Sequence, residues 1–405
     1  MIQEKVGLIP RYNWDYRFPD LIQALGGIIA NDVHSERTLE KIYGQKPIFT
    51  TSGRASLYVI LKSLNLPVGS YVGVPLFCCP VVFDAVRQAN LIPKFIDIEL
   101  DDYNISTSDL NEKKASLSAV IAVHMFGHPA DMDSISKVCQ EIPIIEDCAQ
   151  SLFSKYKGRY TGFESTASFY SFRSGKYISA GEGSAIFCSD SSLQSAIKNT
   201  VEHFEEWSLL KEISHCSATF MKSFFYQKPW YGLFGSPLGR MLDKRLNLTA
   251  KNGFECKQIS KGDSAIIGGR IVGFIEKVNR QRENALVLLN KIRIEETVLP
   301  IEKEGCLSNY YQFAIRFRDC DQRDFVAEYL LKSGIDSAKY LDEVVDLARD
   351  RYGYSGDCPN AELASKTVLV IPHHYTLSGK ELNYIADTLN EVDRQLAKSK
   401  AKEGE

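Results

Sequence analysis

The segment Ser171-Phe172-Arg173-Ser174-Gly175-Lys176 follows Ile144-Ile145-Glu146-Asp147-Cys148-Ala149-Gln150 and precedes Gly181-Glu182-Gly183. An acid therefore ends a short apolar run, and about thirty residues later a lysine stands on a glycine-rich loop. A pyridoxal phosphate site needs this pair, because the amine forms a Schiff base and the carboxylate keeps the pyridine nitrogen protonated. We therefore expect Lys176 and Asp147 to lie in one site.

Around this segment, short apolar runs alternate with amphipathic stretches between residues 50 and 190. The runs are rich in β-branched and aromatic residues, which is typical of strands buried on both faces. Strands are expected at 72–75, 93–98, 119–124, 143–146, 167–172 and 184–188. One helix is expected after Thr51-Ser52 and another after the capping residue Asp131. This alternation predicts an α/β domain around a mostly parallel sheet.

The character of the chain changes near residue 200. Residues 200–255 are rich in aromatic residues, and prolines and glycines from Pro229 to Gly239 predict that no long helix forms there. A long helix is expected next, with one face shared by Ile271, Phe274, Ile275 and Val278.

A smaller unit is expected after the long helix. It would hold a strand at 310–317, a helix capped by Asp321 with Phe325 on its apolar face, and a last helix opened by the capping box Ser378-Gly379-Lys380-Glu381. We therefore predict a large cofactor-binding domain at 1–255, with an insertion at about 200–255. A small α+β domain at 256–405 would include the long connecting helix.

Composition narrows the class of protein. With 405 residues and a net charge of −3, the chain gives no reason to expect a nucleic-acid partner. Its ten cysteines form no CxxC pair, which indicates a reduced, cytoplasmic protein without a zinc ribbon. No signal peptide and no membrane-spanning run is recognised.

Four further residues have the right chemistry for the cofactor. Gly53 and Arg54 open an expected helix, where unpaired N–H groups bind a phosphate, although taken alone these residues are more typical of a simple capped helix. Ser171 is placed to donate to the same phosphate. Gln150 either hydrogen-bonds the cofactor's 3-oxygen or lies on the surface.

Two other features have competing interpretations. His124 and His128 resemble a metal-binding pair, but we expect no metal because no carboxylate stands nearby in the sequence. The aromatic and basic stretch 220–242 suits either a membrane surface or the packing of a dimer partner. We favour the partner, since the prolines and glycines predict that no amphipathic helix forms.

At these residues the chain resembles the DegT/DnrJ/EryC1/StrS family of pyridoxal phosphate-dependent sugar aminotransferases, over residues 45–395. The resemblance rests on the order and spacing of Ser52-Gly53-Arg54-Ala55, residues 93–98, residues 124–133, Glu146-Asp147-Cys148-Ala149-Gln150, and Ser171-Phe172 with Lys176 and Gly181-Glu182-Gly183. It implies the aspartate aminotransferase fold (type I), a homodimer, and a cofactor bonded to Lys176. Asp147 would face the pyridine nitrogen and Gln150 the 3-oxygen, with Gly53, Arg54 and Ser171 around the phosphate.

The resemblance also implies an activity. An amino group would move in ping-pong fashion from an amino acid, typically glutamate, to a keto sugar on a nucleotide, with Lys176 as the acid and base. Such sugars enter O-antigens, other polysaccharides and secondary metabolites. Lysine rather than histidine at position 176 favours transamination over sugar dehydration.

The chain departs from the family's pattern at several positions. Cys79 stands where an aromatic residue usually stacks on the cofactor ring, and Arg173 replaces a usual histidine. Cys256 and Gln258 occupy positions where the family usually has asparagine and arginine. These changes leave two hypotheses open, an active sugar aminotransferase and a regulatory relative that has lost turnover.

Overall fold

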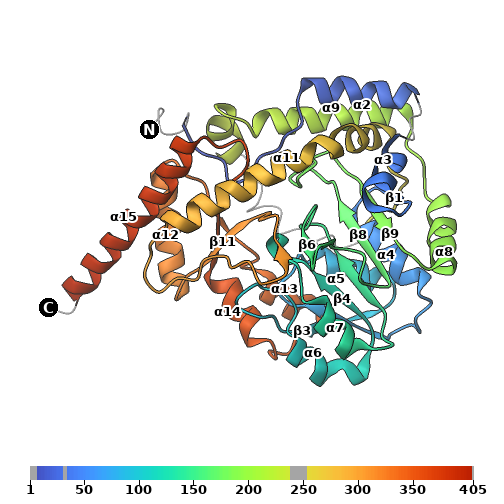
Figure 1. Ribbon diagram of the computed structural model, residues 1–405, viewed down its shortest axis with the longest axis horizontal. Coiled ribbons are helices and arrows are strands. Elements are labelled where there is room, and N and C mark those ends of the chain that lie inside the picture. The colour runs from blue at the N-terminus through green and yellow to red at the C-terminus, as the bar shows by residue number, and fades with distance from the viewer. Residues whose placement is uncertain (1–6, 31–33, 238–252, 404–405) are drawn as a thin grey trace.

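The computed structural model describes residues 7–30, 34–237 and 253–403. At its centre is a seven-stranded sheet in the order β1-β9-β8-β5-β4-β2-β3 (Figure 1). The strands are β1 (Ile48–Thr50), β2 (Tyr71–Pro75), β3 (Ile92–Ile96), β4 (Leu117–Val123), β5 (Ile144–Asp147), β8 (Ala167–Ser171) and β9 (Ser184–Phe187). The five strands from β3 to β8 pair in parallel, whereas β9 and β1 pair antiparallel. The expected mostly parallel sheet is confirmed, although the sequence analysis missed β1.

Helices between the strands cover this sheet. They are α4 (Gly53–Ser63), α5 (Val81–Gln88), α6 (Thr107–Lys113), α7 (Met132–Cys139) and α8 (Ser191–Glu202), with 3-10 turns at Lys114–Ser116 and Met125–Gly127. Ser52 accepts a hydrogen bond from the N–H of Ala55 at the start of α4, and Asp131 accepts one from Ser134 at the start of α7. Both expected caps are therefore confirmed.

A layer of helices crosses one end of the sheet (Figure 1). It consists of α2 (Phe18–Ala30), α3 (His34–Tyr43), α9 (Leu209–Phe225) and α11 (Lys261–Lys291). The expected long helix is α11, and Ile271, Phe274 and Val278 are buried on it. Ile275 is 39% exposed, so the prediction that it shares the buried face is wrong. The stripe of α11 that its neighbours cover is narrower than the residue spacing suggested.

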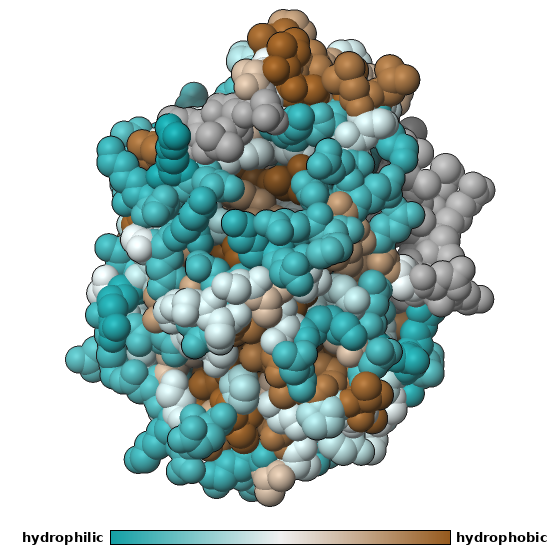
Figure 2. Space-filling view, turned by 90° about the vertical axis from the view of Figure 1, so that its right-hand side faces the viewer, coloured by the Kyte–Doolittle hydropathy of each residue, from teal (hydrophilic) through white to brown (hydrophobic). Residues whose placement is uncertain are grey.

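The prediction of no long helix within residues 200–255 is also wrong. Helix α9 has 17 residues and buries small or polar residues such as Cys216, Thr219 and Ser223, whereas its large apolar residues are mostly exposed. Figure 2 shows apolar side chains gathered at the end of the molecule where α2 and α9 lie, although no helix among the described residues is long and apolar enough to cross a membrane. The prolines and glycines that suggested an interruption begin at Pro229, after α9 has ended. They accompany the π-helical turn η3 (Tyr231–Gly235), while residues 238–252, including Gly239, lie outside the described residues.

The C-terminal unit has its own three-stranded sheet, in the order β11-β13-β12. Its elements are β11 (Phe313–Arg316), α12 (Cys320–Lys332), β12 (Ala338–Lys339), α13 (Val344–Tyr352), α14 (Pro359–Thr367), β13 (Val368–Ile371) and α15 (Gly379–Glu403). A separate small sheet has the short strand β6 (Lys155–Tyr156) between β7 (Arg159–Tyr160) and β10 (Cys306–Leu307), so it joins residues that follow β5 to residues that precede β11. The domain boundary at residue 255 stays a proposal.

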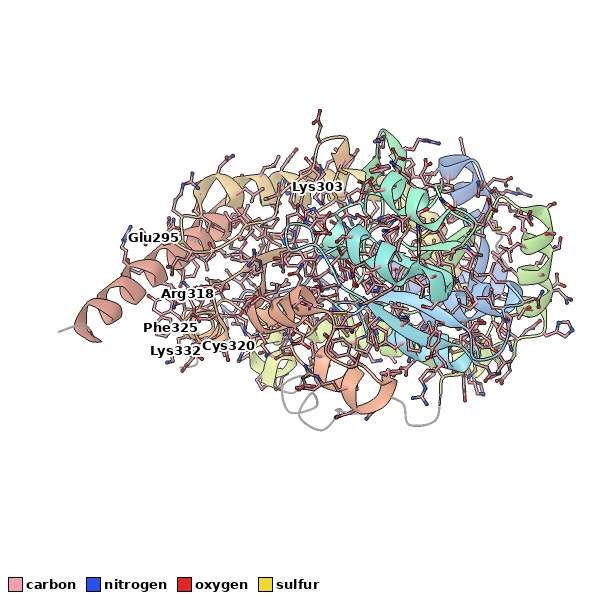
Figure 3. All side chains as sticks on the ribbon, turned by 90° about the horizontal axis from the view of Figure 1, so that it is seen from below. Glu295, Lys303, Arg318, Cys320, Phe325 and Lys332 are labelled. Atoms are coloured by element: carbon pink, nitrogen blue, oxygen red, sulfur yellow. The ribbon has the colours of Figure 1, made fainter. Side chains whose placement is uncertain are left out.

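Helix α12 differs from the prediction at its start. Asp319, not Asp321, caps it by accepting a hydrogen bond from the N–H of Gln322 at 2.8 Å. Phe325 was expected on the buried face but lies at the outer edge of the molecule, near Lys332, and is 42% exposed (Figure 3). The capping box of α15 is confirmed, because Ser378 and Glu381 exchange backbone-to-side-chain hydrogen bonds.

Candidate active site

A cavity of about 410 Å³ lies where the parallel strands end. Asp147 is the last residue of β5 and Ser171 the last of its parallel neighbour β8, so both face the edge where α/β sheets bind ligands. Every site residue expected from the sequence lines this one cavity: Gly53, Arg54, Cys79, Asp147, Gln150, Ser171 and Lys176. The structure therefore brings together residues that span more than a hundred positions in the chain.

The loop that carries Lys176 is tightly wound. Gly175 and Gly181 have φ angles of 89° and 120°, which only glycine adopts readily. The ammonium nitrogen of Lys176 lies 4.8 Å from the centre of the Tyr311 ring. The Tyr311 hydroxyl in turn donates a hydrogen bond to the carbonyl of Gly175 at 2.7 Å. The loop and the aromatic ring thus fix where the amine lies.

The charge on Lys176 is disfavoured in this cavity. Burial and the nearby Arg173 guanidinium lower the pKa of Lys176 to about 8, against the opposing charges of Asp147 and Cys79. A lysine with this pKa is neutral part of the time near pH 7. It can therefore act as a nucleophile or accept a proton.

Asp147 is buried, and one oxygen accepts a hydrogen bond from the N–H of Ala149 at 2.9 Å. Burial raises its pKa, although that hydrogen bond and the charge of Lys176 partly offset the effect. A cation at the other carboxylate oxygen would stabilise its ionised form. A protonated pyridine ring has that charge, so the residue fits the role predicted for it.

The first turn of α4 forms another wall. The Ser52 side chain accepts a hydrogen bond from the N–H of Ala55. Gly53 and Arg54 line the cavity at the N-terminus of α4, which is the positive end of the helix dipole. A side chain at Gly53 would approach Phe169 within 3.2 Å, so the backbone fits closely there. The Arg54 guanidinium lies over the Phe254 ring at 5.2 Å. This wall suits a phosphate.

Gln150 is buried and already hydrogen-bonded. Its carbonyl oxygen accepts from the N–H of Phe126 at 3.1 Å, and its amide donates to the Tyr340 hydroxyl at 3.2 Å. The alternative that Gln150 lies on the surface is therefore wrong. Its role toward a 3-oxygen stays a prediction.

The departures from the family pattern fall in different places. Cys79 and Arg173 line the cavity, and Arg173 acts on the pKa of Lys176. The thiol of Cys256 lies close enough to Arg54 for that charge to act on its pKa, which burial raises to about 11. Gln258 instead turns its amide toward the carbonyl of Phe204.

Several residues at the site were not anticipated. Tyr311 was expected only as part of a strand, Trp207 and Phe254 were assigned to the insertion, and Lys257 to the start of the small domain. Trp207 donates a hydrogen bond to the carbonyl of Gln258 at 2.8 Å and contacts the Lys257 ammonium. They lie outside the quoted motifs, so only their aromatic character hinted at a role.

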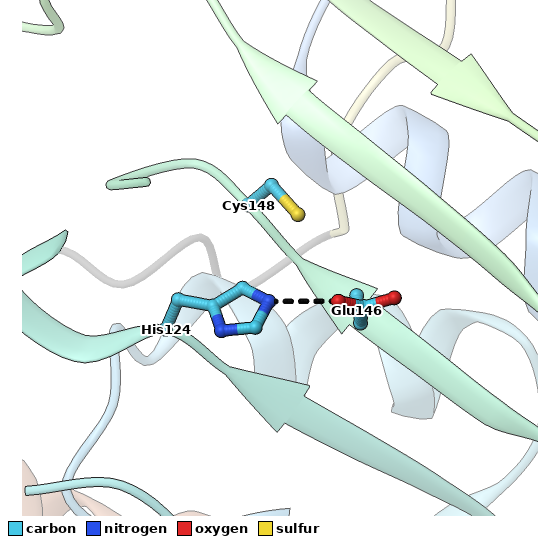
Figure 4. A group of neighbouring side chains, drawn as sticks. All are labelled: His124, Glu146 and Cys148. Atoms are coloured by element: carbon cyan, nitrogen blue, oxygen red, sulfur yellow. Dashed lines mark hydrogen bonds and ion pairs between the residues drawn. The ribbon is translucent and has the colours of Figure 1, made fainter. Parts of the chain in front are cut away.

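The reason given against metal binding at His124 needs correction, because a carboxylate does lie beside it. Among the described residues, His124, Glu146 and Cys148 are the one group close enough to hold a metal ion (Figure 4). Yet His124 accepts the N–H of Ala130 on one nitrogen and contacts Glu146 at 3.0 Å with the other. Glu146 also accepts from the N–H of Gly162. These hydrogen bonds occupy the ligand atoms of His124 and Glu146, which indicates a structural network.

Comparison with known proteins decides the family. A model of the DegT/DnrJ/EryC1/StrS aminotransferase family matches residues 34–390. The chain belongs to this family. It is 24% identical to the GDP-perosamine synthase of Escherichia coli O157:H7 over 355 residues, which cover 87% of each protein. It is 23% identical to the dTDP-4-dehydro-2,3,6-trideoxy-D-glucose 4-aminotransferase of Saccharopolyspora spinosa over 351 residues, 85% of this chain and 83% of that protein.

The fold agrees with this assignment to the DegT/DnrJ/EryC1/StrS family. The aminotransferase TlmJ from Streptoalloteichus hindustanus superposes with a TM-score of 0.74, over 96% of this chain and 100% of that one, at 19% identity. The expected type I fold is confirmed, and the chain is an aminotransferase of a pyridoxal phosphate-dependent family.

Proposed function

We propose that this aminotransferase moves an amino group from L-glutamate to a keto sugar carried on a nucleotide, with pyridoxal phosphate held in the Lys176 cavity. One observation carries the proposal: a lysine amine, a buried carboxylate and a helix N-terminus line the same cavity. These three groups match the aldehyde, the pyridine nitrogen and the phosphate of the cofactor. The residues that line the cavity therefore fit pyridoxal phosphate.

Each wall has a separate task in this proposal. Lys176 holds the cofactor and, once released, carries a proton, which its lowered pKa permits. Asp147 faces the ring nitrogen, while Gly53, Arg54 and Ser171 hold the phosphate. When bound, the cofactor supplies an electron sink for the carbanion that forms during transamination.

The nucleotide sugar is proposed from the relatives. The two named above act on GDP- and dTDP-linked sugars by their names, and the match to each covers most of this chain. We extend to this chain the same substrate class, a cytoplasmic location and assembly as a homodimer.

The experiment uses the visible absorbance of lysine-bound cofactor in the purified protein. We expect the band in the wild type, its loss on adding glutamate, and no band in Lys176→Ala. Lys257→Ala removes another lysine from the same cavity and should keep the band. A band that persists in Lys176→Ala would refute the assignment of that lysine.

The acceptor is tested separately. Keto sugars linked to GDP, dTDP or UDP are incubated with the protein and glutamate, and amino-sugar products are measured by mass spectrometry. A product with any of them supports the proposal. A protein whose band responds to glutamate but which aminates none of these sugars would contradict the acceptor class while leaving the cofactor site intact.

A further inference from the structure

We propose that Arg173 binds the α-carboxylate of the amino donor beside the amine of Lys176. The inference rests on the proposed aminotransfer and adds the residue that recognises its first substrate. Arg173 is exposed and lines the Lys176 cavity, so its side chain is accessible to a ligand there. A guanidinium presents paired N–H groups that match the two oxygens of a carboxylate.

The backbone places Arg173 and Lys176 at the two ends of one turn. The N–H of Lys176 donates a hydrogen bond to the carbonyl of Arg173 at 2.9 Å. On either side of Arg173, the N–H groups of Phe172 and Ser174 donate to carbonyls of the Gly181–Gly183 loop at 2.8 and 2.9 Å. The chain that carries the guanidinium is therefore fixed before a substrate arrives, which lowers the entropy cost of binding.

The charge of Arg173 acts at the amine end of the cavity. Burial and this charge both lower the pKa of Lys176, and the same charge opposes the effect of burial, which raises the pKa of Tyr311. The amine of Lys176 lies 4.8 Å from the centre of the Tyr311 ring, so the three groups are neighbours. The charge of Arg54, on the phosphate wall, acts instead on Cys256. The two arginines therefore face different parts of the bound ligands.

Other charged groups of the cavity already have a partner or a proposed one. Lys257 pairs with Glu255 at 2.7 Å. Asp147 would face the pyridine nitrogen of the cofactor, and Arg54 its phosphate. Within the part of the chain that the structure describes, the guanidinium of Arg173 has no carboxylate partner. An anionic group of a substrate can therefore bind there without displacing an ion pair.

Glu182 also lines the cavity, but its charge acts elsewhere. It acts on His215 and on Lys257. It is not among the charges that act on the amine of Lys176, whereas the charge of Arg173 is. Glu182 therefore leaves Arg173 available to a ligand.

The position of Arg173 distinguishes between the anionic groups of the two substrates. In an amino acid, the α-carboxylate is attached to the carbon that carries the reacting amino group. In a nucleotide sugar, several bonds of the sugar separate the keto carbon from the diphosphate. The reacting atoms of both substrates must reach the place of the Lys176 amine, so the α-carboxylate is the anion that comes close to Arg173.

The test compares two amines that discharge the visible band of the cofactor-loaded protein. L-Glutamate carries the carboxylate, whereas methoxyamine carries none. Stopped-flow absorbance gives a second-order rate constant for each. Arg173→Gln should lower the ratio of the glutamate constant to the methoxyamine constant by about tenfold or more. Because both amines displace the same lysine, the ratio removes the effect of the substitution on the pKa of Lys176.

Two further variants show whether the effect belongs to the guanidinium. Arg173→Lys keeps the charge but loses the paired N–H groups, so its ratio should lie between those of the wild type and Arg173→Gln. Arg159→Gln removes an exposed arginine that pairs with Glu164 away from the cavity, and it should leave the ratio unchanged.

An equilibrium measurement requires no reaction. Glutarate has the two carboxylates of glutamate but no amine. Its dissociation constant with the cofactor-loaded protein, measured by calorimetry, should rise by about tenfold from the wild type to Arg173→Gln. Equal dissociation constants in the two proteins would contradict the assigned role.

The outcomes separate this inference from the proposed function. A wild-type band that glutamate does not discharge would overturn both. A band that responds normally, with the same ratio in the wild type and Arg173→Gln, would overturn only the role of Arg173 and describe it as a solvated side chain. Weaker retention of pyridoxal phosphate in Arg173→Gln, again with an unchanged ratio, would assign the guanidinium to the cofactor instead of the donor.

Discussion

Lys176 is held in an environment that weakens its charge. At a pKa of about 8 the amine is about one-quarter neutral at pH 7.5, whereas an ordinary lysine is neutral in about one molecule per thousand. Only the neutral amine attacks an aldehyde. The lowered pKa therefore prepares the residue to take up its cofactor at neutral pH.

This pKa predicts how cofactor uptake depends on pH. The rate of pyridoxal phosphate uptake by cofactor-free protein should rise with pH and level off above about pH 8. Arg173→Gln removes a positive charge that lowers the pKa, so it should move the midpoint upward. Stopped-flow absorbance measures both. An uptake rate that still rises between pH 9 and 10 in the wild type would contradict a pKa of about 8 for Lys176.

A control separates a local charge effect from a general one. Arg159 is exposed and pairs with Glu164 away from the cavity. Arg159→Gln should leave the midpoint of uptake unchanged.

At the residue scale, the sequence predicted the parts of the site that lie in compact motifs. Lys176 and Asp147 stand in glycine-rich or apolar surroundings that mark them locally. Tyr311 was missed because its contact with Lys176 joins segments 135 positions apart, with no pattern beside either residue. Gln150 was left undecided because only the fold reveals Phe126 and Tyr340 as its partners.

Helix starts show how local chemistry fixes an element. Asp319 and Asp321 are both plausible caps for α12, but only Asp319 has the extended backbone that brings its carboxylate to the N–H of Gln322. Sequence spacing alone does not separate two acids two residues apart.

The two acids make a matched test of this cap. Asp319→Ala should lower the free energy of unfolding by about 1 kcal/mol. Asp321→Ala should change it by less than about 0.5 kcal/mol. Urea denaturation measures both. Equal losses in the two variants would contradict the assigned cap.

Helix α9 is an element that was not predicted from the sequence at all. Its buried face consists of residues such as Cys216, Thr219 and Ser223, while large apolar residues point outward. Its apolar residues recur at helical spacing, so the pattern itself is compatible with a helix. The helix was missed because the prolines and glycines from Pro229 onward were taken to interrupt the whole stretch, although they follow its end.

At the scale of the whole molecule, the N-terminal segment ties distant parts together. Asp15 contacts Arg270 at 2.6 Å and Lys277 at 2.7 Å on α11, and accepts from the Tyr375 hydroxyl at 2.6 Å. Burial opposes the charge of Asp15, but the two cations hold its pKa well below its usual range. The central sheet was predictable from local runs, whereas this connection spans about 250 positions and was not.

This cluster predicts a pH-dependent contribution to stability. Asp15→Asn leaves two cations without their carboxylate and should lower the free energy of unfolding by about 3 kcal/mol at pH 7. Because the folded pKa lies below the unfolded value of about 3.9, the contribution is complete above that value and is lost as pH falls below it. The difference between variant and wild type should therefore narrow only below about pH 4.

Urea denaturation at several pH values measures this difference. Asp133 pairs with Lys157 at the exposed surface and supplies the control. Asp133→Asn should cost less than about 1 kcal/mol. A loss in Asp15→Asn no larger than in this control would contradict the role of the cluster.

Tyr311 stands just before the first strand of the C-terminal sheet, whereas Asp147 ends a strand of the central one. The amine of residue 176 thus lies between two sheets, with the Tyr311 ring before a strand of one and the Asp147 charge at the end of a strand of the other. Burial is the largest cause of the lowered pKa of that amine. Any change in the packing of the two sheets that admitted water to the amine would therefore raise its pKa and make it a poorer nucleophile at neutral pH.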